Sequence, residues 1–558
     1  MKKTRMVNPF GRKDYGLTPL LLIISLLFSS CSYDEILDEK TTVAATESTL
    51  LQSDASSCPT ITAYTDQPVG YSGRNDMAVL RNFFFSGSIC EDNLTISPKN
   101  ALWNTESAYA NNIGAHGMRS INGERGCSLD AYGKFIPSPG LKTHLTVLHA
   151  RQWDPHIVVG QQKPAHLPGR ACHWTAGQWD AYEKYAYECL KFIMNDYKEG
   201  FDEAIIEVSN EVDIAGAIGY WFVDGNWVTN GDVKAYNGLI KCYAQWSDAV
   251  KRFNKNHPGK RVKLFGAGFT VYTMWWWKSN NWATKLIEDC KRNNWQLDAV
   301  AFHQYGAEML GSRPDYSGGR NPKFESTIKT IQDKLNSVGF TRTEIWMTEW
   351  GCSTWFRTER LKNNYRPVGG AFAAAFMHIA LNSGVDGMVP LRLRDPNGTN
   401  NWTSVGSLAT NNGIIYPKPI YNVFRMFYQM PGTRKKAEWK NSNYQLGAIA
   451  SSNSGQVGVL VYNYDWDNAK IVDRSIPHNV QVKVVSKGLT GTVKVKRFLV
   501  DNETSNLAKY VDAGRVPSLP DCELQMVEEY TAQSVNGTIT LKPRTLGQSA
   551  VSLWLVSK

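Results

Sequence analysis

Between about residues 78 and 395, short apolar runs alternate with longer segments in which apolar residues recur every three or four positions. This alternation is typical of strand–helix units that build a parallel sheet. Eight runs have the length and composition of strands: residues 82–86, 117–121, 156–160, 204–208, 262–266, 299–303, 344–348 and 387–391. Amphipathic helices are predicted between them, including residues 176–195, 232–253, 282–293, 327–338 and 369–382. Eight such units predict an α/β fold, a (β/α)₈ barrel at residues 76–430.

The pattern changes after about residue 430. Strand-like runs separated by Gly, Asn and Pro replace the helices, at residues 446–450, 457–464, 480–485, 492–499, 525–529, 538–542 and 550–556. Short strands at this spacing predict a C-terminal β-sandwich at residues 431–558. The segment 59–75 is a candidate for one further strand of that sandwich.

The N-terminus has the pattern of an export signal. Basic residues between Lys2 and Lys13 precede an apolar run at 17–28, which is shorter than the ~20 residues needed to span a bilayer. The run ends in Phe-Ser-Ser followed by Cys31, which resembles a bacterial lipoprotein signal. That resemblance implies a signal peptide at 1–30, lipidation of Cys31 and attachment to the outer membrane of a Gram-negative bacterium. Residues 31–58 are Thr-, Ser- and Ala-rich and predict a flexible tether.

Composition narrows the function classes. A chain of 558 residues is too long for one hydrophobic core, which stops growing near ~250–300 residues. The 19 Trp, 25 Tyr and 21 Phe supply flat apolar faces of the kind on which sugar rings stack. Of the net charge of +10, residues 1–30 carry +4, and the remaining 10 − 4 = +6 is spread along the chain without a basic stripe, so no nucleic-acid partner is expected.

The nine cysteines after Cys31 include no CxxC pair and no spacing typical of metal ligands. A Cys90–Cys127 bridge is conceivable in an exported protein, but the sequence does not establish it. No phosphate-binding loop or spaced histidine motif occurs either. We therefore expect neither a metal nor a cofactor; the oligomeric state stays open.

Two of the predicted strands end in acidic residues, where barrel enzymes carry their active sites. The fourth strand runs into Ser209, Asn210 and Glu211, and the seventh into Thr348 and Glu349. The two glutamates are 349 − 211 = 138 residues apart, yet their strands face each other across the barrel mouth. A pair of carboxyl groups ~5–5.5 Å apart is the arrangement that retaining glycosidases use. The pattern therefore predicts hydrolysis of a glycosidic bond.

The residues around these acids resemble the retaining barrel glycosidases of clan A. The shared features are Asn210-Glu211 on the fourth strand, Thr-Glu-Trp-Gly around Glu349 on the seventh, and a His-x-Tyr formed by His303 and Tyr305 on the sixth. The resemblance implies that Glu211 is the general acid/base and Glu349 the nucleophile. It also implies that Asn210 binds the sugar 2-hydroxyl, and that His303 and Tyr305 line the subsite and orient the nucleophile.

Within the clan, the chain is most similar to the family of β-xylosidases and α-L-iduronidases. Glu-Val-Ser-Asn-Glu at 207–211 resembles that family's Glu-Val-Trp-Asn-Glu, and residues 417–424 join barrel to sandwich in a similar way. The resemblance covers roughly residues 80–558. It departs at Ser209, where the family has Trp, and at Val212, where it has Pro.

Three further residues near the acids are assigned from their positions. Arg119, at the end of the second strand, is expected to hold Glu349 ionised, and Trp350 to contact the substrate. Glu207 shares a strand face with Glu211 but lies four residues deeper, ~13 Å along the strand. We interpret Glu207 as a buried, paired structural acid.

Arg392 and Arg394 come at the end of the eighth strand, two residues apart, so their side chains are expected to point to the same face. They have the chemistry to bind a uronate or sulfate through paired hydrogen bonds. The alternative is an ion pair with a neighbouring acid, for which Asp395 is the obvious partner.

The predicted function is retaining hydrolysis of a β-linked plant or algal polysaccharide or its oligosaccharides, in the manner of a β-xylosidase. Two alternatives stay open: an endo-acting hydrolase similar to agarases and porphyranases, and a surface glycan-binding lipoprotein without catalysis. A structural envelope lipoprotein is a third, for which the paired acids would be coincidence. Two facing acids favour the enzyme, because binding alone does not require them.

Overall fold

The computed structural model describes residues 58–69, 83–87, 102–121, 124–198, 200–213, 232–270, 281–305, 322–352, 361–395, 402, 404–441, 445–467 and 472–558. The predicted signal peptide, Cys31 and Cys90 lie outside these residues, as does nearly all of the predicted tether. No helix among the described residues is long and apolar enough to cross a bilayer.

The first large sheet contains eight parallel strands in the order β11-β10-β9-β8-β7-β6-β3-β2. Its edge strands β11 and β2 also lie against each other, so the sheet curves round into a barrel. The strands are β2 Phe83–Gly87, β3 Ala115–Ser120, β6 Asp154–Val159, β7 Glu203–Val208, β8 Arg261–Phe265, β9 Ala299–Tyr305, β10 Glu344–Gly351 and β11 Gly387–Pro390. All eight predicted barrel strands are confirmed, within two residues at nearly every end.

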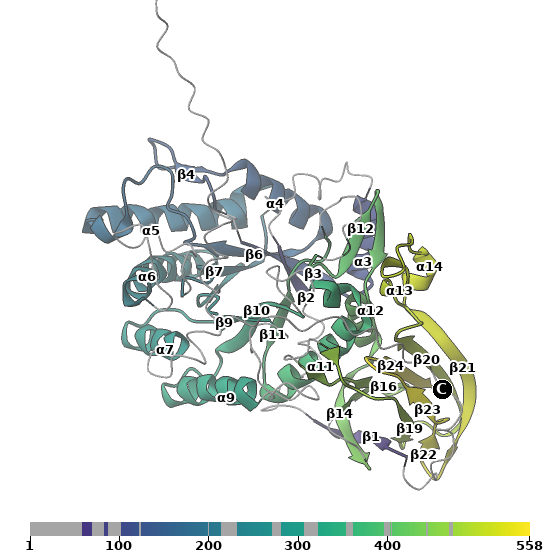
Figure 1. Cartoon of the computed structure of the whole chain (residues 1–558). Helices are drawn as coiled ribbons and strands as arrows, with labels where there is room; N and C mark the ends of the chain where they lie inside the picture. The colour runs from purple at the N-terminus through teal and green to yellow at the C-terminus, as the bar shows by residue number, and fades with distance from the viewer. Residues whose placement is uncertain are drawn as a thin grey trace, which may run out of the picture. The chain divides into compact units, whose positions relative to one another are not determined.

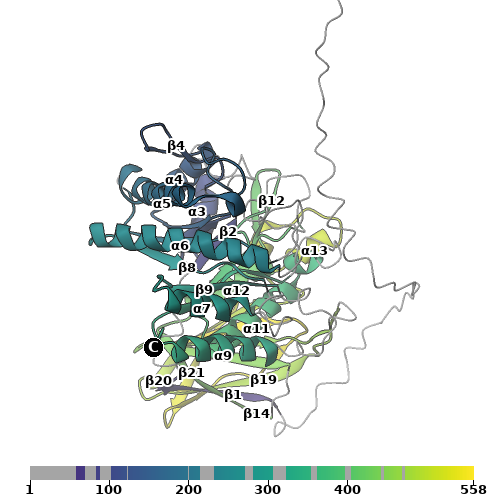
Figure 2. The same cartoon turned by 90° about the vertical axis from the view of Figure 1, so that its left-hand side faces the viewer.

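Helices cover the outside of this barrel (Figure 1), and α5, α6, α7 and α9 follow one another along one side (Figure 2). The helices are α3 Trp103–Asn111, α4 Pro139–Arg151, α5 Ala176–Lys191, α6 Val233–Asn256, α7 Trp282–Arg292, α9 Pro322–Ser337, α11 Pro367–Ser383 and α12 Pro419–Gln429. The helix α5 continues as one π-helical turn, Phe192–Asp196. Local sequence sets several of the ends: Ser138 caps α4 by accepting from the Leu141 N–H, and Gly384, with φ +78°, ends α11.

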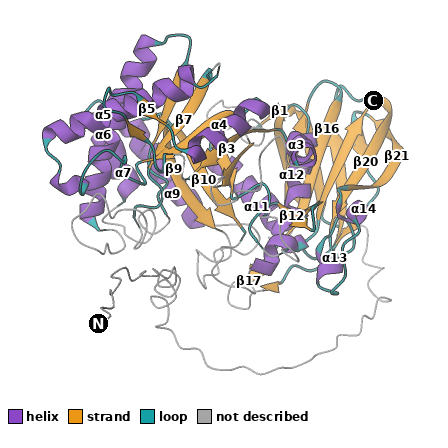
Figure 3. Ribbon diagram, turned by 90° about the horizontal axis from the view of Figure 1, so that it is seen from above, coloured by secondary structure: helices purple, strands orange, loops and turns teal. Residues whose placement is uncertain are grey.

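The second sheet has ten strands in the order β1-β14-β15-β16-β24-β20-β21-β22-β19-β23. Its strands are β1 Thr60–Pro68, β14 Thr433–Lys440, β15 Leu446–Ser452, β16 Gln456–Asn463, β19 His478–Val485, β20 Gly491–Val500, β21 Gln525–Val535, β22 Thr538–Thr540, β23 Arg544–Leu546 and β24 Val551–Ser557. Figure 3 shows β16, β20 and β21 running through this layer. Because β1 pairs with both β14 and β19, the sandwich-like sheet also closes into a barrel.

Smaller elements complete the described chain. They are the hairpins β4 Ser128–Leu129 with β5 Phe135–Ile136, β12 Leu408–Asn411 with β13 Ile414–Pro417, and β17 Trp466–Asp467 with β18 Val472–Asp473, the short helices α13 Ala508–Val511 and α14 Leu519–Cys522, and two single 3₁₀ turns, Ala171–His173 and Lys362–Tyr365.

The barrel interior is filled by a small apolar cluster with polar residues next to it. Ile205, Phe265, Ala299, Ala301, Trp346 and Val389 form the cluster. Ile205 and Glu207 point to the same face of β7, so the strand that supplies an apolar residue to this cluster carries a buried acid two residues later. The apolar floor therefore gives way to a polar layer toward the carboxyl ends of the strands.

Candidate active site

The backbone leaves β7 in an unusual conformation that turns Glu211 into the barrel mouth. Ser209 has φ +74° and Glu211 φ +51°, the left-handed region that costs an L-residue roughly 1–2 kcal/mol. The segment is bonded to the chain beyond β8: the Glu211 N–H donates to the Gly268 carbonyl at 2.9 Å, and the Gly268 N–H donates to the Ser209 carbonyl at 3.3 Å. Such strain persists only where neighbouring structure fixes it.

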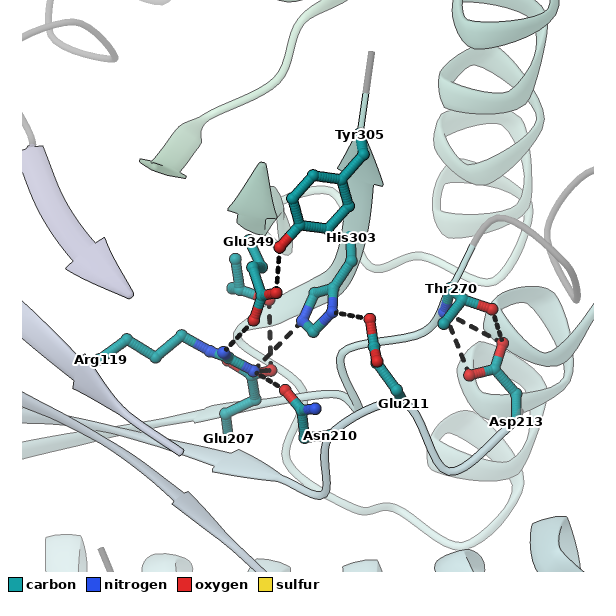
Figure 4. Close-up of polar contacts among 10 residues, drawn as sticks. Arg119, Glu207, Asn210, Glu211, Asp213, Thr270, His303, Tyr305 and Glu349 are labelled. Carbon is teal, nitrogen blue, oxygen red and sulfur yellow. Dashed lines mark hydrogen bonds and ion pairs between the residues drawn. The ribbon is translucent and has the colours of Figure 1, made fainter. Parts of the chain in front are cut away.

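Glu211 and Glu349 come together at the mouth of the barrel (Figure 4). One carboxylate oxygen from each, together with a ring nitrogen of His303, lie within 4.8 Å of one another. The Glu211 side chain is 25% exposed and that of Glu349 is 10% exposed. The fold thus brings together two acids that are 138 residues apart in the sequence. Of the two side chains, Glu211 is the more exposed to solvent.

Arg119 lies under both acids and is completely buried. Its Nε and Nη2 donate to the two oxygens of Glu207 at 2.9 and 2.7 Å. The same Nη2 donates to Asn210 Oδ1 at 2.7 Å, and Nη1 donates to Glu349 Oε2 at 3.3 Å. Burial lowers the pKa of Arg119, but Glu207 and the two other acids outweigh burial and raise it. The guanidinium therefore stays charged and ties three side chains together.

His303 and Tyr305 each contact one of the paired acids. His303 Nδ1 lies 2.9 Å from Glu211 Oε1, and its Nε2 lies 3.2 Å from Arg119 Nη2. Because Arg119 can only donate, a neutral ring accepts at Nε2 and donates from Nδ1 to Glu211. The Tyr305 hydroxyl donates to Glu349 Oε1. Burial lowers the pKa of His303 and the nearby glutamates raise it, with a net increase; burial and Glu349 both raise the pKa of Tyr305.

Glu207 has the structural role expected of it. Besides Arg119, His156 Nε2 lies 2.7 Å from Glu207 Oε2, and the Thr348 hydroxyl donates to Oε1 at 3.2 Å. Burial raises the pKa of Glu207, but Arg119 and His156 outweigh it, so the pKa falls. Glu207 is therefore an ionised, fully bonded anion beneath the site.

Two of the predicted substrate contacts, Trp350 and Arg394, are buried against other parts of the protein. The Trp350 ring is fully buried against Phe372, Phe376 and Phe424, on the helix side of β10. Successive residues of a strand point to opposite faces, so the neighbour of an inward Glu349 has to point outward.

Arg394 is bonded to residues outside the predicted site. It donates to Glu106 Oε2 at 2.6 Å and to Thr410, and it is buried. The expected partner Asp395 instead pairs with Lys418. Arg392 is half-buried, with φ +61°. Burial raises the pKa of Asp395, and Arg392 is close enough to oppose part of that rise. The ion-pair alternative thus describes Arg394, although with a different acid.

Several residues at the site were not predicted. Asp213 is buried and bonded to Thr270, and His156 supports Glu207. A Cβ added to Gly268 would lie 2.5 Å from His303 Nε2 and 2.6 Å from Glu207 Oε1, so only glycine fits between these side chains. The Gly-Ala-Gly at 266–268, at the end of a predicted strand, is the sequence signal that could have indicated this close approach.

Among the described residues, Glu211, His303 and Glu349 form the group whose spacing could also hold a metal ion. The fixed positive charge of Arg119, 3.3 Å from Glu349, opposes a cation at that position. The donor set fits proton transfer and nucleophilic attack better than metal binding.

Active sites of (β/α)₈ barrels lie at the carboxyl ends of the strands, and two facing carboxyl groups are what glycoside hydrolysis requires. The model of glycosyl hydrolases family 39 matches residues 227–531, which is 531 − 227 + 1 = 305 of 558 residues. The chain belongs to this family, and it is a glycosidase. The match includes His303, Tyr305 and Glu349 and begins after Glu211.

Solved structures show the same fold. A monomeric β-xylosidase from Caulobacter crescentus matches at 14% identity with a TM-score of 0.64, covering 89% of this chain and 99% of that one. A family 39 enzyme from Xanthomonas axonopodis pv. citri matches at 14% identity and a TM-score of 0.64, covering 89% and 97%. A bacterial orthologue of human α-L-iduronidase matches at 13% identity and a TM-score of 0.63, covering 89% and 84%. No curated protein matches the sequence.

Proposed function

We propose that this glycosidase cleaves β-linked glycans of plants or algae with retention of configuration, using Glu211 as general acid/base and Glu349 as nucleophile. The observation that carries the proposal is the approach of the two carboxyl groups, whose nearest oxygens lie within 4.8 Å. Retaining enzymes use a separation of ~5–5.5 Å, whereas inverting enzymes leave ~6.5–9.5 Å for a water molecule.

The contacts of each acid support its role. Glu349 accepts from the Arg119 guanidinium and the Tyr305 hydroxyl, and these two donors hold its carboxyl group in one orientation, as a nucleophile requires. Glu211 is more open to solvent, which suits a group that protonates a departing alcohol and later receives a proton from water.

The reaction then proceeds in two displacements. In the first, a Glu349 oxygen bonds to the anomeric carbon while the glycosidic C–O bond breaks, and the Glu211 proton passes to the leaving oxygen. In the second, Glu211 takes a proton from water, whose oxygen bonds to the anomeric carbon and releases Glu349. Asn210 Oδ1 accepts from Arg119 at 2.7 Å, and this bond supports the role proposed for Asn210 in bonding the sugar 2-hydroxyl.

A β-xylosidase-like substrate is the form of the proposal that the family favours, since solved relatives include enzymes described as β-xylosidases. The test is hydrolysis of an aryl β-glycoside panel and a polysaccharide panel by wild type, Glu349→Ala and the matched variant Glu344→Gln. Glu344 lies on the same strand at its far end and bonds Lys263 and Trp346. We expect Glu349→Ala to lose more than ~1000-fold in activity and Glu344→Gln to keep it.

Proton NMR of the first product formed should show the β-anomer before mutarotation. An α-anomer would contradict the double displacement, and wild-type activity in Glu349→Ala would contradict the nucleophile. Glycan binding without hydrolysis of any substrate would point to a non-catalytic binding protein, and products of internal cleavage would point to an endo-acting enzyme.

We also propose that Cys31 is lipidated and attaches the enzyme to the outer membrane. The support is the sequence alone: basic residues, an apolar run at 17–28 and Ser-Ser before the cysteine. In a Gram-negative host, radiolabelled palmitate should be incorporated into the wild type and not into Cys31→Ser. Equal labelling of both proteins would refute the anchor.

A further inference from the structure

Asp213 is a buried carboxyl group two residues beyond Glu211, and its side chain is directed at the chain that follows β8 (Figure 4). Its two oxygens accept from the Thr270 N–H at 3.1 and 3.0 Å, and Oδ2 also accepts from the Thr270 hydroxyl at 2.8 Å. Asp213 thus accepts hydrogen bonds from both the backbone N–H and the side-chain hydroxyl of Thr270. Asp213 does not contact Glu211 or Glu349 through any of these bonds.

This contact continues a ladder that begins at the end of β7. The Gly268 N–H donates to Ser209, the Glu211 N–H donates to Gly268, and Thr270 then donates to Asp213. The steps advance by two residues on each chain, from 209 to 211 to 213 and from 268 to 270. Glu211 therefore lies between two fixed points, although its own φ of +51° is unfavourable for a glutamate.

We propose that Asp213 is a positioning residue for the acid/base, because its bonds to Thr270 hold Glu211 in the left-handed conformation that aims its carboxyl at the leaving oxygen. The inference rests on the proposed function. The second support of Glu211, His303, fixes the end of the side chain, whereas Asp213 fixes the backbone from which that side chain starts. The chain has Val212 between the two acids, which lacks the ring by which a proline would fix φ, so the restraint has to come from neighbouring contacts.

The proposed role affects one proton transfer. Departure of phenol or an alcohol needs the Glu211 proton as the glycosidic bond breaks, and a displacement of ~1 Å can cost about 100-fold. Dinitrophenolate is a stable anion and leaves without that proton. Loss of Asp213 should therefore slow the first displacement for poor leaving groups and spare it for good ones, which a general loss of structure would not do.

The experiment compares kcat/KM for phenyl and 2,4-dinitrophenyl β-D-xylosides, or for the same aryl pair of whichever sugar the wild type cleaves. The variants are Asp213→Ala, Asp213→Asn, Thr270→Val and Thr270→Ser. We expect Asp213→Ala to lose about 100-fold on the phenyl glycoside and less than about fivefold on the dinitrophenyl glycoside. Thr270→Val, which lacks only the hydroxyl donor, should show a smaller loss of the same kind, and Thr270→Ser should resemble the wild type.

Equal losses on both glycosides, or no loss on either, would overturn the positioning role. If Asp213→Ala does not fold, Thr270→Val decides by the same comparison, because it removes one hydrogen bond and keeps the shape. Glu349→Ala separates this inference from the proposed function. If it retains activity, the proposed function fails; if it is inactive while Asp213→Ala slows both glycosides equally, only the positioning role fails.

Discussion

Glu207 at the barrel mouth and Asp395 beyond β11 are both fully buried carboxyl groups, yet their pKa values move in opposite directions. Burial raises both, because an anion loses its hydration. At Glu207 the guanidinium of Arg119 and the ring of His156 outweigh burial, and the pKa falls. At Asp395 the ammonium of Lys418 and the Gly406 N–H do not outweigh the effect of burial, and the pKa of this carboxyl group rises.

The difference lies in how the cation is shared. Arg119 bonds Glu207 with two nitrogens and still reaches Asn210 and Glu349. Lys418 bonds Asp395 and the Ser404 carbonyl, neither of which is part of the site. A buried ion pair is thus weak evidence for an active site, whereas a buried cation shared between a structural acid and a reactive one is much stronger.

The largest effect is expected from Arg119→Met. Removing the guanidinium leaves the buried Glu207 with only His156 and Thr348 as bonded partners, which should cost about 3–5 kcal/mol of unfolding free energy. It also removes a donor to Glu349, so the activity of the remaining folded enzyme should fall about 100- to 1000-fold. Urea unfolding and kcat/KM measure the two effects. Unchanged activity in a folded Arg119→Met would separate Arg119 from the chemistry.

Lys418→Met tests the other side of the comparison. It should also cost about 3–5 kcal/mol, because Asp395 is left without its cation. The folded fraction should keep its kcat/KM, since Lys418 contacts none of the candidate site residues in any described bond. The double variant with Asp395→Asn should recover part of the stability. A loss of activity at full folding would extend the active site to this pair.

Tyr305→Phe should give a smaller change. A hydrogen bond to a charged group contributes about 1.5–3 kcal/mol, which corresponds to about 10- to 150-fold in kcat/KM if Glu349 is the nucleophile. The matched control is Tyr421→Phe, which removes a buried hydroxyl that bonds the Tyr109 carbonyl at 2.7 Å. The control should lose only about 1 kcal/mol of stability and no activity. Similar kinetics for both variants would deny Tyr305 a role.

The smallest effect concerns pH. The folded pKa of Glu207 lies below its unfolded value of about 4.3, so its contribution to stability is present above that pH and is lost as the pH falls. One such group changes stability by at most about 1.4 kcal/mol per pH unit. Urea unfolding between pH 6 and pH 3 should show this slope in the wild type and a shallower one in Arg119→Met. An unchanged slope would mean that Arg119 does not keep Glu207 ionised.

The barrel could be predicted from the sequence because strands buried on both faces appear as continuous apolar runs. The ends of those runs then located Glu211 and Glu349. Strand β14 was missed because Arg434, Lys435 and Lys436 interrupt its apolar pattern, although Arg434 is buried in the fold. Because Lys and Arg are rarely buried, a run of them in the sequence conceals a strand of this kind.

The errors within the site have two different causes. The position of Trp350 followed from the alternation of strand side chains, so the sequence contained the correct answer. The partner of Arg394 is Glu106, which is 288 residues away on α3, and no spacing in the chain indicates it. The same holds for Asp213 and Thr270, which are 57 residues apart and meet only because β7 and β8 are neighbours.

The order in which the chain is made has a consequence for β1. This strand leaves the ribosome first, but its partner β14 begins 433 − 60 = 373 residues later, after the entire barrel. Until then, a strand with high β-propensity has nothing to pair with, and long-range pairings of this kind form slowly. A protein truncated to begin at Phe83 would keep every barrel strand and yet leave the facing edges of β14 and β19 bare. Such a truncated protein should aggregate through those edges.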